Sequence, residues 1–206
     1  MKLFDIPIKV HWSTIILLVL FMPTFTLVGL AHGLVLFGPV ILFLVGHELA
    51  HALMARKFGY HTRDITLFAL GGVAQIQAIN NLPIKEDLWI SFAGPAFNIV
   101  WVIVFGLSIL LANSMAWTVL VPPLTILLAV NMLLGVFNLI PGFPLDGGRI
   151  SRALCSLKWG PEKGRKVSNW ISWVSGGLMI FAGISLSGGF LLALFGIYIC
   201  YMAFRD

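Results

Sequence analysis

Charged side chains are scarce in this chain. Lys and Arg number 13 and Asp and Glu number 8 among 206 residues, so charged residues make up 10% and hydrophobic residues 59% of the sequence. Soluble domains carry about 25% charged residues. A mean hydropathy of +0.99 agrees with this difference. The composition excludes an ordinary soluble globular protein, and we predict an integral membrane protein embedded in a lipid bilayer.

Long apolar runs supply the expected membrane spans, since a helix needs about 20 apolar residues to cross a bilayer. Five runs have roughly this length and a shorter sixth follows them. They lie at about 12–31, 33–55, 88–112, 117–140, 167–186 and 189–204. We predict an α-helical polytopic membrane protein with six transmembrane helices, forming a single membrane-embedded domain over residues 1–206. The first run resembles a secretory signal, but it exceeds the usual signal length, which favours a retained span.

Basic residues are absent from every second connection between these runs. The connections near His32, Asn113–Ser114 and Ser185–Ser187 contain neither Lys nor Arg, and all 13 basic residues fall in the alternate segments. Lys and Arg stay on the cytoplasmic side of short loops. We therefore predict that both termini are cytoplasmic. The net charge of +5 then reflects membrane anchoring, and we expect no nucleic-acid partner.

Cysteine is also rare. Cys155 and Cys200 are the only two, and no short spacing links them. Both are expected at or near the cytoplasmic side, where disulfides seldom persist. We predict no disulfide and assign neither thiol a role.

One polar cluster interrupts the second apolar run. His47-Glu48-Leu49-Ala50-His51 has the form H-E-x-x-H. Residues four apart share one face of a helix, so both imidazoles can bind one metal ion, and Glu48 can take a proton from water. Catalytic zinc sites use three protein ligands and leave a fourth position for water. Because ionisable groups within a span are costly and usually functional, we predict one Zn²⁺ per chain, with Glu48 as the general base.

The third ligand must come from elsewhere in the chain. The extended zincin motif requires glycine at position 54 and histidine at position 57, where this chain has Met54 and Lys57. Among the later acids, Asp146 closely follows a span and lies in an irregular, proline-interrupted stretch. Irregular backbone at membrane depth is tolerated only where it is buried or lines a wet cavity. We predict Asp146 as the ligand; Glu86 is its main rival, and an ion pair with Arg149 is its alternative role.

The helical pattern lapses between the second and third runs. Ile65–Leu70, a Gly-Gly pair and Val73–Gln77 predict a β-hairpin over about 64–78. The hairpin is either a connector packed on the helices or an edge strand that holds an extended peptide by backbone hydrogen bonds. A helical substrate has its carbonyls already bonded, so hydrolysis in a membrane favours the second interpretation. Gly71 and Gly72 are then candidate substrate-binding residues.

Together these motifs resemble the site-2 protease family of intramembrane zinc metalloproteases, and six-span prokaryotic members are the most similar. The resemblance covers essentially the whole chain. The matching segments are His47–His51, Gly71–Ala74, Phe92–Asn98 and Asn138–Gly148, the last of which has the form N-x-x-P-x-x-P-x-D-G-G. The resemblance implies that His47, His51 and Asp146 bind zinc and that Glu48 activates water. It further implies that Asn138 and Pro141 bind or position the substrate. Gly94, Pro95 and Asn98 match a family motif, for which we expect close helix packing through small residues, with Asn98 as an interhelical hydrogen-bond donor.

The same resemblance implies a substrate and a location. Expected substrates are transmembrane proteins cleaved in or near their spans during regulated intramembrane proteolysis, or remnants of signal peptides. The first and sixth spans would form a lateral gate in a prokaryotic cell membrane. Many relatives append a nucleotide-sensing domain after the last span, whereas this chain stops at Asp206. Regulation by nucleotide therefore stays open, and no pattern in the sequence specifies an oligomeric state.

A membrane metal or proton transporter is the main alternative, with the same His and Asp cluster as its transit site. Transporters usually distribute polar groups along a path and often contain repeated halves. This chain has one cluster and no visible repeat. An inactive scaffold would be expected to lack a ligand or the base, and all four candidates are present. The sequence favours the protease.

Overall fold

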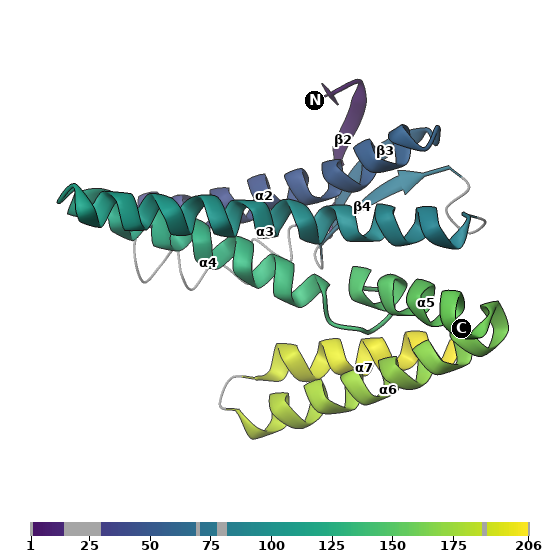
Figure 1. The fold of residues 1–206 in the computed structure, drawn as a ribbon. Coiled ribbons are helices and arrows are strands. Elements are labelled where there is room, and N and C mark those ends of the chain that lie inside the picture. The colour runs from purple at the N-terminus through teal and green to yellow at the C-terminus, as the bar shows by residue number, and fades with distance from the viewer. Residues whose placement is uncertain (1, 15–29, 69–70, 78–81, 187–188, 206) are drawn as a thin grey trace. The chain divides into compact units, whose positions relative to one another are not determined.

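The computed structural model describes residues 2–14, 30–68, 71–77, 82–186 and 189–205 (Figure 1). Helices dominate this part of the chain. The helices are α2 (Leu30–Lys57), α3 (Ile84–Ser114), α4 (Val121–Asn138), α5 (Asp146–Trp159), α6 (Pro161–Ser185) and α7 (Phe190–Arg205), with a 3₁₀ turn, η2, at Thr118–Leu120. The predicted helical fold is confirmed in outline.

Four of the described helices are long and apolar enough to cross a membrane, namely those containing Gly38–Lys57, Ile84–Ser114, Thr118–Asn138 and Pro161–Ser185. They correspond to the second to fifth predicted spans. The sixth corresponds to α7, which is apolar but shorter. Most of the first predicted span, about 12–31, lies outside the described residues. The chain is an integral membrane protein, and the described helices account for four of the six predicted spans.

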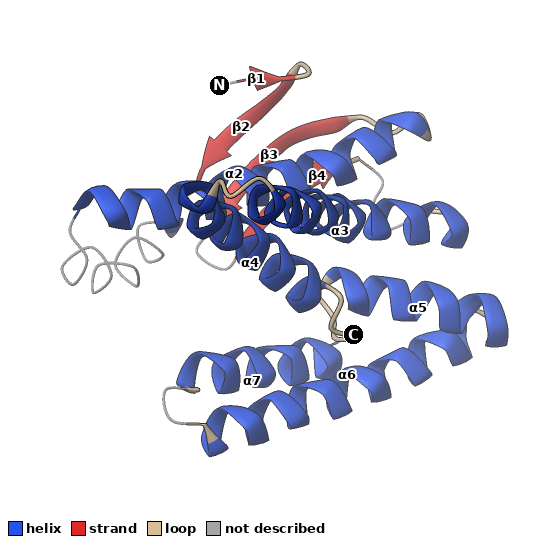
Figure 2. Ribbon diagram, turned by 60° about the vertical axis from the view of Figure 1, so that its left-hand side comes forward, coloured by secondary structure: helices blue, strands red, loops and turns tan. Residues whose placement is uncertain are grey.

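A four-stranded sheet replaces the predicted two-stranded hairpin. The strands β1 (Lys2–Leu3), β2 (Ile6–Val10), β3 (Thr62–Phe68) and β4 (Gly71–Ile76) follow one another in that order across the sheet. Strands β3 and β4 form the hairpin expected near 64–78, whereas β2 adds to β3 in parallel. Confining the β-structure to the segment between the second and third helices was wrong, because the N-terminal segment joins it (Figure 2).

A buried ion pair joins β2 to β3. The Asp64 side chain is only 1% exposed, and the Lys9 Nζ atom lies 2.7 Å from its Oδ2 atom. Thr66 donates its hydroxyl to the other carboxylate oxygen at 2.8 Å. The hydrogen bond from Lys9, aided by that from Thr66, lowers the pKa of Asp64 despite burial. The carboxylate is thus fully partnered, as a buried charge needs to be.

The chain forms two compact units. Unit 1 comprises residues 1–79 and 93–135, and unit 2 comprises residues 80–92 and 136–206. Unit 1 therefore contains the sheet and α2 with the larger parts of α3 and α4, and within it α2 packs against β3 and β4. Unit 2 contains α5, α6 and α7, with α6 packed against both others. Helix α5 was not predicted, because its 14 residues carry three basic side chains and show no apolar run.

Candidate metal centre

Helix α2 brings the two histidines of the H-E-x-x-H motif together. The Nε2 atoms of His47 and His51 lie 3.2 Å apart, and both side chains are buried. Two nitrogens bound to one tetrahedral zinc at about 2.0–2.1 Å would lie about 3.3 Å apart. The donor atoms therefore fit a shared zinc ion without rearrangement.

Helix α3 packs against His47 and His51 at Gly94. A Cβ atom at Gly94 would overlap the Nε2 atoms of both His47 and His51. The absence of a side chain keeps the space at these two nitrogens free. The close helix packing expected at Gly94 is therefore found, and the atoms packed against it are the two histidine nitrogens.

Asn98 lies one helical turn beyond Gly94 in α3, and its side chain contacts His47 at Nδ1, the ring nitrogen that does not face Gly94. Its Oδ1 atom is 2.5 Å from His47 Nδ1. Its Nδ2 atom donates to Oδ1 of Asn131 in α4 at 3.0 Å, and both amides are fully buried. The spacing of Gly94 and Asn98, four residues on one helix face, is the sequence signal that could have linked both to His47.

The second glycine of the hairpin lies beside Glu48. The Ala74 N–H group in β4 donates to Glu48 Oε2 at 3.0 Å. A Cβ atom at Gly72 would overlap the Glu48 side chain, whereas one at Gly71, whose φ is +141°, would meet nothing within 4 Å. Strand β4 is also an edge of the sheet among the described strands. Glu48 and this edge of the sheet are therefore neighbours.

The other predicted site residues belong to unit 2. Asn138 ends α4, Pro141 lies in the link that follows, and Asp146 is the first residue of α5. Glu86, the rival ligand, lies in the first turn of α3. The structure thus places the histidines, Glu48 and the hairpin glycines in one unit and the remaining candidates in the other.

The link that precedes Asp146 folds tightly onto the start of α5. Cβ atoms at Gly147 and Gly148 would overlap backbone atoms of residues 139–143, so close packing requires both glycines of the D-G-G sequence. Helix α6 holds the same link, since Ser175 donates to the Pro141 carbonyl at 3.2 Å and Ser172 accepts the Phe143 N–H at 3.2 Å.

Arg149 forms an ion pair with Asp87 at the start of α3. Sequence analysis had considered Asp146 as its partner. The guanidinium therefore has a carboxylate partner from another helix, which sequence spacing did not indicate.

Comparison with known proteins supports a common origin for these motifs. The profile of Peptidase family M50 matches residues 35–115 and 107–182, a range that includes both the H-E-x-x-H motif and the Asn138–Gly148 stretch. The Rip3 protein of Mycobacterium tuberculosis is 34% identical over 216 residues, covering 93% of this chain and 54% of its own length. A zinc metalloprotease of Methanocaldococcus jannaschii is 34% identical over 208 residues, covering 100% of this chain and 59% of its own length.

A solved structure shares the fold. The site-2 protease from Methanocaldococcus jannaschii has a TM-score of 0.71 and 31% sequence identity, and the match covers 100% of this chain and 93% of that one. Stage IV sporulation protein FB of Bacillus subtilis is a more distant relative, 28% identical over 129 residues, covering 63% of this chain and 43% of its own length. The chain spans about half the length of the curated relatives it matches.

Proposed function

This chain belongs to Peptidase family M50, the family of the site-2 proteases, and on that premise we propose that it is a zinc-dependent intramembrane endopeptidase. Its substrates are membrane proteins that are cleaved in or near their transmembrane segments. The observation that carries the proposal is the 3.2 Å distance between the Nε2 atoms of His47 and His51. Both residues lie on a helix that is long and apolar enough to cross a membrane, and Glu48 lies between them in the sequence.

His47, His51 and Asp146 are the proposed ligands of one zinc ion. Each offers one ligand atom, an imidazole nitrogen or a carboxylate oxygen, and both atom types are common zinc ligands. The spacing of the two histidines supports their part directly. Asp146 is supported by its place in the D-G-G sequence of the family signature, and Glu86 is the other carboxylate to be tested.

Glu48 acts as the general acid and base of peptide hydrolysis. When bound, zinc supplies Lewis-acid chemistry, which makes water easier to deprotonate and polarises a peptide carbonyl. Glu48 takes the proton from the attacking water and returns it to the departing amine. The Ala74 N–H group donates to one oxygen of this carboxylate, which helps to hold the carboxylate in place.

The substrate is held as an extended strand along β4. An edge strand offers backbone groups to a peptide that adds to the sheet, and Gly72 brings this edge against Glu48. Gly71 and Gly72 bind the substrate backbone in this proposal, and Asn138 and Pro141 bind or position the substrate. The first predicted span and α7 would admit the substrate from the lipid.

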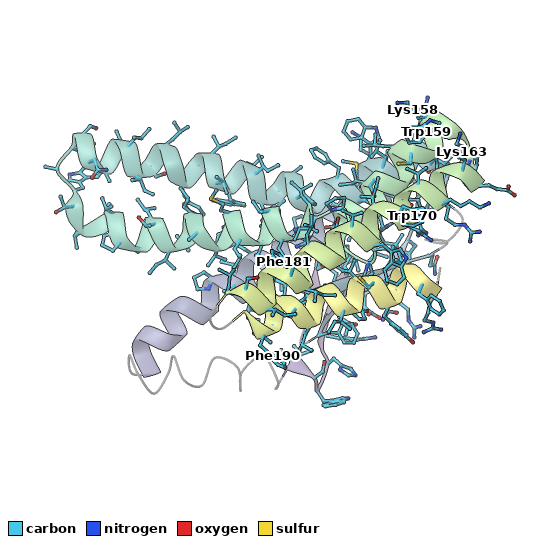
Figure 3. The ribbon with its side chains drawn as sticks, turned by 90° about the horizontal axis from the view of Figure 1, so that it is seen from below. Lys158, Trp159, Lys163, Trp170, Phe181 and Phe190 are labelled. Atoms are coloured by element: carbon cyan, nitrogen blue, oxygen red, sulfur yellow. The ribbon has the colours of Figure 1, made fainter. Side chains whose placement is uncertain are left out.

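The polarity of α6 supports cytoplasmic termini. Lys158, Trp159 and Lys163 gather at one end of the α5–α6 pair, whereas Phe181 and Phe190 lie toward the other (Figure 3). Basic and aromatic residues mark the cytoplasmic interface of a membrane. With the start of α6 at that interface, the C-terminal end of α7 returns to the cytoplasmic side of what we propose is a prokaryotic cell membrane.

The proposal is tested by comparing the wild type with Glu48→Gln. Both proteins are reconstituted in lipid vesicles with a panel of single-span membrane proteins, and the products are identified by mass spectrometry. We expect cleavage by the wild type and none by the variant, with about one zinc per chain in both. Cleavage at the wild-type rate by the variant would remove Glu48 from the mechanism. Zinc uptake into sealed vesicles without cleavage would favour the transporter.

A further inference from the structure

A directed chain of hydrogen bonds behind His47 begins at a backbone carbonyl in α4. The Nδ2 atom of Asn131 donates to the Leu127 carbonyl oxygen at 2.9 Å. A carbonyl oxygen can only accept a hydrogen bond. The amide of Asn131 must therefore present its nitrogen to Leu127, and its Oδ1 atom is the one that faces α3.

The next bond carries this direction to α3. Asn98 Nδ2 lies 3.0 Å from Asn131 Oδ1, and because that oxygen can only accept, Asn98 must present its nitrogen there. The Oδ1 atom of Asn98 consequently faces His47, at 2.5 Å from Nδ1. The proton in this last bond must belong to the imidazole, since an amide oxygen cannot donate. The neutral ring then has its free lone pair on Nε2.

We propose that Asn98 and Asn131 are positioning residues, which fix the tautomer and the ring orientation of His47 so that Nε2 is the metal-binding nitrogen. This inference rests on the proposed function, because it takes His47 to be a zinc ligand. Ligating histidines commonly donate their second N–H to a protein acceptor, which fixes the ring and raises its basicity. Here the acceptor is itself oriented by a second amide on another helix.

Burial argues against a role in packing alone. Asn98 and Asn131 are both 0% exposed, and a buried amide costs free energy unless its polar atoms are bonded. Leucine has the same branching at Cγ without that cost. Helices α3 and α4 also approach closely beside the two amides. A Cβ atom at Gly135, one turn beyond Asn131, would lie 3.3 Å from the Asn98 Cβ atom. The two buried amides are therefore better explained by their hydrogen bonds, from Asn131 to Asn98 and from Asn98 to His47, than by packing alone.

Three variants separate positioning from packing. Asn98→Leu removes the acceptor of the His47 N–H, whereas Asn98→Asp keeps an acceptor oxygen of nearly the same shape. Asn131→Leu leaves Asn98 in place but removes the group that orients it. Ser108→Ala in α3 and Thr125→Val in α4 are matched controls, because each hydroxyl bonds only to the carbonyl one turn earlier in its own helix.

The first readout is zinc retention by the purified chain in detergent against a graded chelator, with the visible spectrum of the cobalt-substituted protein. We expect Asn98→Leu to lose about 10- to 100-fold in zinc affinity and to change the cobalt spectrum. Asn131→Leu should show a smaller loss, and so should Asn98→Asp, which keeps an acceptor for the His47 N–H but loses the donor to Asn131 Oδ1. Both controls should match the wild type. Wild-type affinity and spectrum in Asn98→Leu would overturn the inference, as would an equal loss in the controls.

The second readout separates this inference from the proposed function. Magnetic resonance of protein labelled at the histidine ring nitrogens reports the tautomer of His47 after zinc has been removed. We expect the hydrogen on Nδ1 in the wild type and a mixture of tautomers in Asn98→Leu. The same tautomer in both would overturn the role of Asn98. A wild type that binds no zinc would overturn the proposed function, and the metal-positioning role with it.

Discussion

The backbone N–H of Ala74 in β4 donates to the carboxylate of Glu48 in α2 across 3.0 Å. This bond joins the edge of the sheet to α2 within unit 1. In the proposed function, the strand edge that would hold an extended peptide and the carboxylate that would act as general base are therefore kept close together. On that proposal the sheet places the substrate backbone relative to Glu48.

Added volume at Gly72 should displace Glu48 without removing zinc. A Cβ atom at this position would overlap the Glu48 side chain, so we expect Gly72→Val to lower the cleavage rate at least tenfold while the zinc content stays near one per chain. The matched control is Val73→Leu, because Val73 is half-exposed on the opposite face of β4. Full activity in Gly72→Val would show that β4 does not position the base.

Added volume at Gly94 should instead prevent metal binding. We expect Gly94→Ala to reduce zinc affinity at least tenfold, because the new Cβ atom would overlap the Nε2 atoms of both His47 and His51. Gly106→Ala tests the same substitution in the same helix, where the nearest atom is Leu128 Cδ1 at 3.8 Å. Zinc titration of both variants in detergent makes the comparison. Equal affinities would mean that α3 moves aside easily or that zinc binds elsewhere.

The features that sequence could predict are local ones. The H-E-x-x-H motif needs only the helical repeat to bring His47 and His51 to one face, and apolar runs report spans by their length alone. The prolines and the D-G-G sequence after Asn138 likewise predicted an irregular segment between two helices. For such features the chemistry and the spacing lie within a few residues of each other.

The features that sequence missed depend on contacts between distant segments. Strand β2 is too short to be recognised alone. It pairs with β3, where Lys9 contacts Asp64, 55 residues away. Asn98 was expected to donate an interhelical hydrogen bond, and it does so to Asn131. Its second bond, to His47, depends on how the helices pack and was not predicted. Helix α5 was not predicted, because its polar composition resembles that of a loop and contains no long apolar run. In each case tertiary packing, rather than local preference, decides the structure.

Removal of the third ligand should distinguish the two candidate carboxylates. We expect Asp146→Ala to lose most of its bound zinc, because two histidines alone leave the ion with too few protein ligands. Glu86→Ala should keep about one zinc per chain. Metal analysis of both purified variants beside the wild type gives the answer directly. Retention of zinc in Asp146→Ala with loss in Glu86→Ala would exchange their roles.

The ion pair between Lys9 and Asp64 should make the sheet sensitive to acid. Because the hydrogen bond from Lys9 lowers the pKa of Asp64 below its ordinary value of 3.8, the pair stabilises the folded state fully above about pH 4. This contribution falls below that pH and is lost as the pH drops through the folded-state pKa. At neutral pH we expect Asp64→Asn to cost about 1–2 kcal/mol, since Lys9 is half-exposed and keeps part of its hydration.

Hydrogen exchange of β2 and β3 measures this effect from neutral pH down to about pH 3. We expect the wild type to lose protection toward the acid end, whereas Asp64→Asn should show reduced protection that changes little over the same range. Glu162→Gln, at the exposed start of α6, is the matched control and should follow the wild type. If the wild type and Asp64→Asn lose protection equally at low pH, the acid sensitivity of the sheet comes from other carboxylates. The ion pair between Lys9 and Asp64 would then contribute little to the pairing of β2 with β3.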